Sequence, residues 1–155
     1  MKVITIFLFL MLVPCFYLSQ MKTGTFSDLE ILQKEKPKPV IIHMYTSWCS
    51  VCKIESFQLN KNKDLVKLIN ENFYLISFDP EKMKEKINFQ GKEFNYLPNG
   101  NSGIHELALA LSKNKNKPVY PLWIILDKDQ NLIEYHEGKF KPEEMKLKLE
   151  KVLKF

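Results

Sequence analysis

Two cysteines three positions apart are the residues of this chain whose types and spacing most clearly suggest chemistry. They lie in the segment Trp48-Cys49-Ser50-Val51-Cys52-Lys53. The apolar run 40–45 before them predicts a buried strand, and residues 53–57 after them predict the start of a helix. The first sulfur would then lie at a helix N-terminus, where free backbone N–H groups and the helix dipole favour thiolate over thiol. The segment therefore predicts redox chemistry.

The elements around this segment alternate between helix and strand. A helix at 26–32, which Ser27 or Asp28 would cap, precedes the strand at 40–45. After the cysteines, a helix runs to Leu59, a polar break follows at 60–63, and a helix resumes at 64–72 before a strand at 73–79. This order is typical of a crossover unit with parallel strands. The near-continuous apolarity of 40–45 predicts a central strand that is covered on both faces.

The second half of the chain predicts an antiparallel extension of the sheet. Residues 87–96 alternate around a Gln-Gly turn and predict a small hairpin, and 98–101 predicts a loop. Ser102 is predicted to cap a helix that runs through Lys113. The strand at 122–126 would return as an antiparallel partner at 132–137, and a last helix would begin at Pro142. The chain is thus predicted to be one α/β domain.

The charged residues argue against a nucleic-acid partner. The chain has 155 residues, a formal net charge of +5 and 23 basic residues, all of them lysine. Proteins that read phosphates or bases usually use the planar guanidinium of arginine, which this chain lacks. The positive charge is interpreted as a solubility feature with weak affinity for acidic partners or anionic lipid.

Residues 1–20 differ from the rest and predict export. Met1-Lys2 is a short positive start, and the apolar run from Val3 to Val13 is shorter than the ~20 residues of a membrane-spanning helix. We expect 1–20 to be a signal peptide or an N-terminal membrane anchor, and 21–155 to be the exported domain, periplasmic or attached to the membrane. Cys15 lies where a lipoprotein signal places its lipidated cysteine; the alternative is that it is removed with the signal.

Removal of the signal would leave Cys49 and Cys52 as the only cysteines. A disulfide that encloses two residues stabilises a fold little, so a functional role is favoured over a structural one. The alternative is a copper-binding metallochaperone, because two thiolates can hold copper(I). A structural zinc site is disfavoured, since zinc usually takes four ligands and no second cluster of cysteine or histidine is present. We therefore predict a redox-active cysteine pair with no metal or other cofactor.

Taken together, these motifs resemble a thioredoxin fold over residues 26–155. The resemblance is carried by Trp48 and the Cys-x-x-Cys pair, by Tyr120-Pro121 directly before the strand at 122–126, and by Gly138 after the next strand. The broken helix before Asp79 and the insertion at 87–96 are similar to bacterial periplasmic members akin to the C-terminal domain of DsbD-type proteins. The resemblance implies a central mixed sheet flanked by helices, with a small hairpin-like insertion.

The family also implies a role for each residue of the site. Cys49 would be the exposed nucleophile and Cys52 the buried resolving thiol. Pro121 would be a cis-proline that faces them, leaving the backbone of Tyr120 free to pair with an extended substrate. Trp48 would shield the cysteines and form part of the docking surface. The implied activity is thiol–disulfide exchange by a monomer with substrate proteins and a redox partner protein, in the direction of disulfide reduction.

Three residues or pairs depart from the family pattern or lie beside the motif. His43 stands six positions before Cys49, where thioredoxins usually carry a buried acid. It would either accept a proton from Cys52 or be a core histidine satisfied by a backbone partner. Ser50-Val51 matches neither the Gly-Pro of thioredoxins nor the Pro-His of oxidising relatives. The pair therefore leaves open whether the protein acts as a reductase, an oxidase or an isomerase. Glu55, one turn beyond Cys52, would either tune the site electrostatically or be a solvated helix residue, and the solvated position is favoured.

Overall fold

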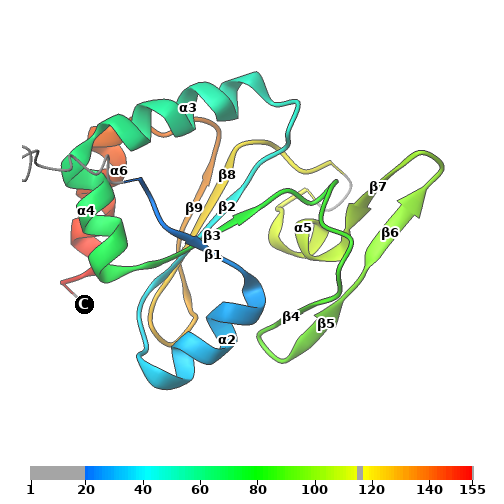
Figure 1. The fold of residues 1–155 in the computed structure, drawn as a ribbon, viewed down its shortest axis with the longest axis horizontal. Coiled ribbons are helices and arrows are strands. Elements are labelled where there is room, and N and C mark those ends of the chain that lie inside the picture. The colour runs from blue at the N-terminus through cyan, green and yellow to red at the C-terminus, as the bar shows by residue number, and fades with distance from the viewer. Residues whose placement is uncertain (1–19, 115–116, 155) are drawn as a thin grey trace, which may run out of the picture.

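The computed structural model describes residues 20–114 and 117–154, which form a five-stranded sheet with helices on both faces (Figure 1). The strand order is β1-β3-β2-β8-β9. β3 runs parallel to both β1 and β2, whereas β8 runs antiparallel to β2 and to β9. The strands are Thr23–Gly24 (β1), Val40–Met44 (β2), Tyr74–Phe78 (β3), Leu122–Leu126 (β8) and Leu132–Glu137 (β9). The predicted α/β class and mixed sheet are confirmed.

Helices on the two faces divide the core into two clusters. The helices are Phe26–Glu35 (α2), Ser50–Lys61 (α3), Lys63–Asn72 (α4), Glu106–Leu111 (α5) and Pro142–Val152 (α6). In Figure 1, α3, α4 and α6 lie on one side of the sheet, and α2 and α5 lie on the other. Among these described residues, no helix combines the length and the apolarity needed to cross a membrane.

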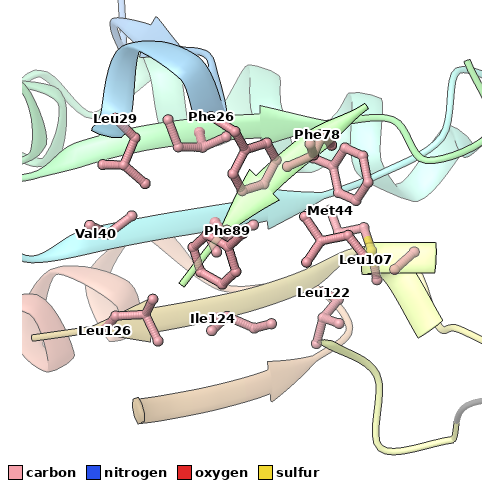
Figure 2. Close-up of a cluster of buried hydrophobic side chains, with 14 residues drawn as sticks. Phe26, Leu29, Val40, Met44, Phe78, Phe89, Leu107, Leu122, Ile124 and Leu126 are labelled. Carbon is pink, nitrogen blue, oxygen red and sulfur yellow. The ribbon is translucent and has the colours of Figure 1, made fainter. Parts of the chain in front are cut away.

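The central strand β2 contributes to both clusters, as its apolar sequence predicts. All five of its residues are buried. Ile41 packs in the cluster with α3, α4 and α6, and its neighbour Ile42 packs in the opposite cluster, because successive side chains in a strand point to opposite faces. Figure 2 shows this opposite cluster, where Phe26 of α2 meets Phe78 of β3 edge to face, with ring centroids 5.5 Å apart. The core thus holds β2 firmly at the centre of the fold.

The insertion after β3 is larger than the sequence pattern predicted. Ile87–Phe89 (β4) and Lys92–Phe94 (β5) form the expected hairpin around Gln90-Gly91. Tyr96–Asn99 (β6) and Ser102–His105 (β7) then form a second hairpin, which turns at Gly100 with φ of 58°. The predicted loop at 98–101 is therefore only the turn at 100–101, and the predicted helix begins at Glu106 and not after Ser102. Helix α5 begins after His105, whose ring accepts a hydrogen bond from the Leu107 N–H.

Helix boundaries near the site follow from capping side chains. Thr25, rather than Ser27 or Asp28, is the N-cap of α2, and its hydroxyl and the Asp28 carboxylate form a capping box. The predicted break between α3 and α4 is confirmed at Asn62, whose side chain accepts a hydrogen bond from the Leu65 N–H and begins α4. The predicted signal or anchor, with Cys15, lies outside the described residues apart from Gln20.

Candidate redox site

The cysteine segment folds as a tight turn that leads directly into α3. β2 ends at Met44, and the Cys49 N–H donates to the Thr46 carbonyl at 3.1 Å. Cys49 is the N-cap of α3, and its Sγ accepts a hydrogen bond from the Cys52 N–H at 3.1 Å. The Cys49 carbonyl accepts the first helical bond from Lys53. The first sulfur therefore lies at the N-terminus of the helix, where a negative charge is stabilised.

Cys49 and Cys52 are joined by a disulfide bond, and their Cα atoms are 5.3 Å apart. Both residues are largely buried, with exposed fractions of 6% for Cys49 and 2% for Cys52. Cys49 is the more exposed of the two, but the implied exposed nucleophile is itself buried in this disulfide form.

The sheet register brings Tyr120-Pro121 to the same end of the sheet as the cysteine turn. Met44 pairs with Leu122 in the antiparallel β2–β8 ladder, so the chain after Met44 and the chain before Leu122 leave the sheet together. The peptide bond between Tyr120 and Pro121 is cis. The ring of Tyr120 meets the ring of Trp48 edge to face, with centroids 6.1 Å apart. Trp48 is 64% exposed and available for contact with another molecule.

Two carboxylates after β3 tie the cysteine turn to the insertion. Asp79 accepts hydrogen bonds from the backbone N–H groups of Ser47, Glu81 and Lys82 at 2.9–3.3 Å. Glu81 accepts a bond from the Trp48 indole N–H at 2.7 Å. Burial, followed by the charges of Glu81 and Asp79, raises the pKa of the Tyr120 hydroxyl. Sequence reasoning missed both carboxylates; the signal for Asp79 was an acidic residue and a proline directly after a buried strand.

Behind the cysteines, His43 and Glu55 meet in the interior. The His43 ring stacks against the ring of Trp123, with centroids 3.9 Å apart, and its centroid is 5.4 Å from that of Tyr45. Its Nε2 is 3.7 Å from Oε2 of Glu55. Neither atom has a hydrogen-bond partner among the described residues. The predicted backbone partner is therefore not present at Nε2, and the two buried polar atoms face each other.

Glu55 is fully buried, so its predicted solvent exposure is wrong. Its Oε1 accepts hydrogen bonds from the Trp123 indole N–H at 3.0 Å and from the Phe140 backbone N–H. Burial raises the pKa of Glu55 to about 7, against the opposing effects of these two bonds and of Lys139. The carboxyl group therefore changes protonation near neutral pH.

Burial has the opposite effect on His43 because it disfavours the charged form of either group. It lowers the pKa of His43 to about 3. The imidazole is therefore neutral at pH 7, and its contact with Glu55 is not an ion pair. Glu55 and Cys52 lie one turn apart on the buried face of α3, so the titrating carboxyl group is near the second sulfur.

The described residues contain no group of three or more His, Cys, Asp or Glu side chains arranged to hold a metal ion. This observation does not address copper(I), which two thiolates can bind. The copper alternative stays a prediction from the sequence.

Comparison with known proteins identifies the fold. Residues 25–153 match the family model described as Thioredoxin-like domain. A search of curated proteins found no significant match. Similar solved structures include DsbH oxidoreductase, with TM-score 0.59, 13% identity and coverage of 88% of this chain and 86% of that one. A thioredoxin from Thermus thermophilus has TM-score 0.58, 12% identity and coverage of 86% and 88%.

Chloroplastic thioredoxin z is a further similar structure, with TM-score 0.56, 12% identity and coverage of 88% of this chain and 96% of that one. At these identities the structures are evidence for the fold, and the family match extends over almost the whole described domain. The fold carries Cys49 and Cys52 at Cys-x-x-Cys spacing, consistent with a thiol–disulfide oxidoreductase. The chain therefore belongs to the thioredoxin-like domain family.

Proposed function

We propose that this protein is an exported thiol–disulfide oxidoreductase that reduces disulfide bonds of other exported proteins. The main support is the position of Cys49, whose Sγ caps the N-terminus of α3 while it is bonded to Cys52. A sulfur in this position is a good leaving group and a stabilised thiolate, and both properties serve exchange.

In the proposed reaction, the Cys49 thiolate attacks one sulfur of a substrate disulfide. The substrate S–S bond breaks, its second sulfur leaves as a thiolate, and a mixed disulfide forms. Cys52 then loses its proton and attacks Cys49 Sγ, which releases the other substrate sulfur. Two electrons pass to the substrate and the Cys49–Cys52 disulfide is formed. A redox partner protein with a dithiol must then reduce this disulfide before the next cycle.

Glu55 and His43 serve the second half of this reaction. Near pH 7 a fraction of Glu55 is ionised, and it accepts the proton that Cys52 must lose before it attacks. His43 stays neutral and offers Nε2 to the protonated carboxyl group as a hydrogen-bond acceptor. The pair is thus a buried proton acceptor in place of the strand acid that thioredoxins usually carry.

Export is proposed from the sequence of residues 1–20, either as a signal peptide or as a membrane anchor. The domain would then work as a monomer in the periplasm or at the membrane surface. An oxidising compartment is where disulfides form and need repair, which suits a reductase of this kind.

The test uses the reduced protein and the variant Cys52→Ser. We expect the wild type to reduce insulin disulfides, and we expect Cys52→Ser to accumulate a mixed disulfide at Cys49 that identifies substrates by mass spectrometry. Equilibration with glutathione then fixes the direction: a potential well below the glutathione couple supports a reductase, and one of about −120 mV, as in DsbA, contradicts it. Stoichiometric copper in the reduced protein without insulin reduction would favour the metallochaperone.

A further inference from the structure

The outer face of α3 is apolar as well as its inner face. Val51, Ile54 and Phe57 are 47%, 54% and 62% exposed. The inner face carries the buried residues Cys52, Glu55 and Leu59. A helix at the surface of a globular domain normally places polar residues on its outer face. The outer apolar residues of α3 are therefore not explained by the fold and suggest contact with another molecule.

The charges on this face all have the same sign. Lys53 and Lys61 are exposed, whereas the one acidic residue of α3, Glu55, is buried. Lys61 places its Nζ 4.3 Å from the centre of the Phe57 ring, so a positive charge lies directly at the apolar surface. On the other side of Cys49, the carboxylate of Glu81 accepts a hydrogen bond from the indole of Trp48. A molecule seated over Cys49 therefore meets an apolar, basic surface on the α3 side.

This face lies within reach of any protein that reacts with Cys49. At 1.5 Å per residue, Ile54 and Phe57 are about 8 and 12 Å along the helix from Cys49. Exchange requires direct contact between sulfur atoms, so a partner protein must cover Cys49. A specific interface buries about 800 Å² on each partner and extends well beyond this distance. The outer face of α3 would then be covered together with Trp48.

We propose that Val51, Ile54, Phe57, Lys53 and Lys61 form a docking surface for a substrate protein that is apolar and acidic beside its own reactive disulfide. The proposal depends on the proposed function, because it uses sulfur exchange at Cys49 to position the partner. The lysines favour an acidic partner through charge complementarity, and they disfavour a basic one by a similar amount. Apolar contacts of Ile54 and Phe57 supply affinity when water is removed from them.

The test measures how fast the full-length reduced protein reduces two synthetic disulfide peptides. Both peptides contain an internal disulfide with leucines at the same flanking positions. The positions between these leucines and the cysteines are glutamates in one peptide and lysines in the other. The rate constant for each is divided by that of the same protein variant with hydroxyethyl disulfide, a small neutral substrate. We expect the acidic peptide to be reduced about tenfold faster than the basic one, and Lys53→Glu with Lys61→Glu to reverse this preference.

A matched pair of double variants tests the apolar part. Ile54→Ser with Phe57→Ser should lower the normalised rate with the acidic peptide about tenfold. Ile31→Ser with Leu147→Ser removes apolar side chains of similar exposure, 60% and 61%, from α2 and α6, and should leave it unchanged. Equal losses in the two double variants would overturn the proposal, and so would equal rates for the two peptides.

Two further outcomes distinguish a protein docking surface from a failure of exchange chemistry and from a membrane-binding face. Absence of any reaction with hydroxyethyl disulfide would contradict the proposed function itself and not only the docking surface. The double variant Ile54→Ser with Phe57→Ser could instead keep its peptide rates and lose binding to phosphatidylglycerol vesicles. That result would assign the face to a membrane surface and overturn the protein partner. Circular dichroism of each variant checks that the fold is intact.

Discussion

Glu55 and His43 show how a buried pair can combine a cost in stability with a use in chemistry. Each group has one polar atom without a hydrogen-bond partner among the described residues, and these two atoms are 3.7 Å apart. Burial of unsatisfied polar atoms usually costs free energy. The same arrangement provides a carboxyl group with a pKa of about 7 on the face of α3 that carries Cys52.

Glu55→Gln is expected to stabilise the protein increasingly as pH rises. Folded Glu55 keeps its proton up to about pH 7, whereas the unfolded chain releases it near the ordinary pKa of 4.5. The free energy of unfolding of the wild type therefore falls as pH rises from 4.5 to about 7. Glutamine does not titrate, and its amide can donate to His43. We expect the gain to be small at pH 4.5 and about 2–3 kcal/mol at pH 8. Urea unfolding across this range measures it.

The same variant should slow the release of substrate from the mixed disulfide. Without the carboxylate, Cys52 has no buried proton acceptor, so we expect the resolution rate at pH 7 to fall at least about tenfold. The wild-type rate should show an inflection near pH 7 that is missing in Glu55→Gln. Glu30→Gln, at an exposed carboxyl group on α2, is the control. A Glu55→Gln profile that matches the wild type would contradict the proton-acceptor role.

Asp79 is predicted to hold the cysteine turn in place. Asp79→Ala would leave the backbone N–H groups of Ser47 and Glu81 without their acceptor, whereas the Lys82 N–H keeps the Asp79 backbone carbonyl at 3.2 Å. We expect a loss of about 2 kcal/mol in the free energy of unfolding, and a smaller loss for Asp79→Asn, which keeps one carbonyl oxygen. Thermal unfolding compares the two variants. Equal stability of Asp79→Ala and the wild type would show that the turn is held by other contacts.

At the scale of single residues, the sequence predicted those whose signal is local. Spacing identified Cys49 and Cys52, and counting back from Cys49 identified His43. Glu55 was misassigned because its partners, Trp123 and Phe140, are 68 and 85 positions away in the chain. A carboxylate with such distant partners has the same local pattern as a solvated one.

At the scale of elements, the sheet and its principal helices followed from apolar periodicity, and the second hairpin did not. Strong turn signals lie at Pro98, Asn99 and Gly100, and they favoured a loop over the short strands that the structure has on either side. The apolar spacing after Ser102 matched a helix because Ile104 packs from a strand and Leu107 from α5, onto the same core. Periodicity cannot separate two short elements that face one core.

Gly103 is predicted to be essential to the β6–β7 hairpin. A Cβ atom at this position would lie 2.5 Å from the Leu97 carbonyl oxygen and 2.5 Å from the Tyr96 hydroxyl oxygen. We expect Gly103→Ala to lower the free energy of unfolding by about 1–3 kcal/mol, because backbone in the hairpin must move to accept the methyl group. Gly24→Ala is the control, since its Cβ would meet only ordinary contacts at 3.6 Å or more. Chemical denaturation of both variants decides whether the hairpin tolerates the change.

At the scale of the whole molecule, the fold places its cysteine pair after the end of the central strand β2, all five residues of which are buried. The described residues account for the fold, and residues 1–20 carry the prediction of export. The positive start and the apolar run of this segment support that prediction.

Export is tested in bacteria that express the full chain. We expect a maleimide that cannot cross the inner membrane to label reduced Cys49 in cells with a permeabilised outer membrane. Labelling that requires lysis of the inner membrane would contradict export. The mass of the purified protein then separates a removed signal from a retained anchor, because removal of 1–20 leaves a chain that begins near Met21.

The two tryptophans give this molecule a pair of unlike optical reporters. Trp48 is 64% exposed beside the disulfide, and Trp123 is 1% exposed with its ring stacked 3.9 Å from that of His43. We therefore expect emission at long wavelength to come from Trp48 and to follow the oxidation state of the cysteines, and blue-shifted emission to come from Trp123 and to follow protonation of the buried pair. A variant with phenylalanine in place of one indole keeps the emission of the other. Stopped-flow recordings of the two variants would then follow electron transfer and proton transfer separately.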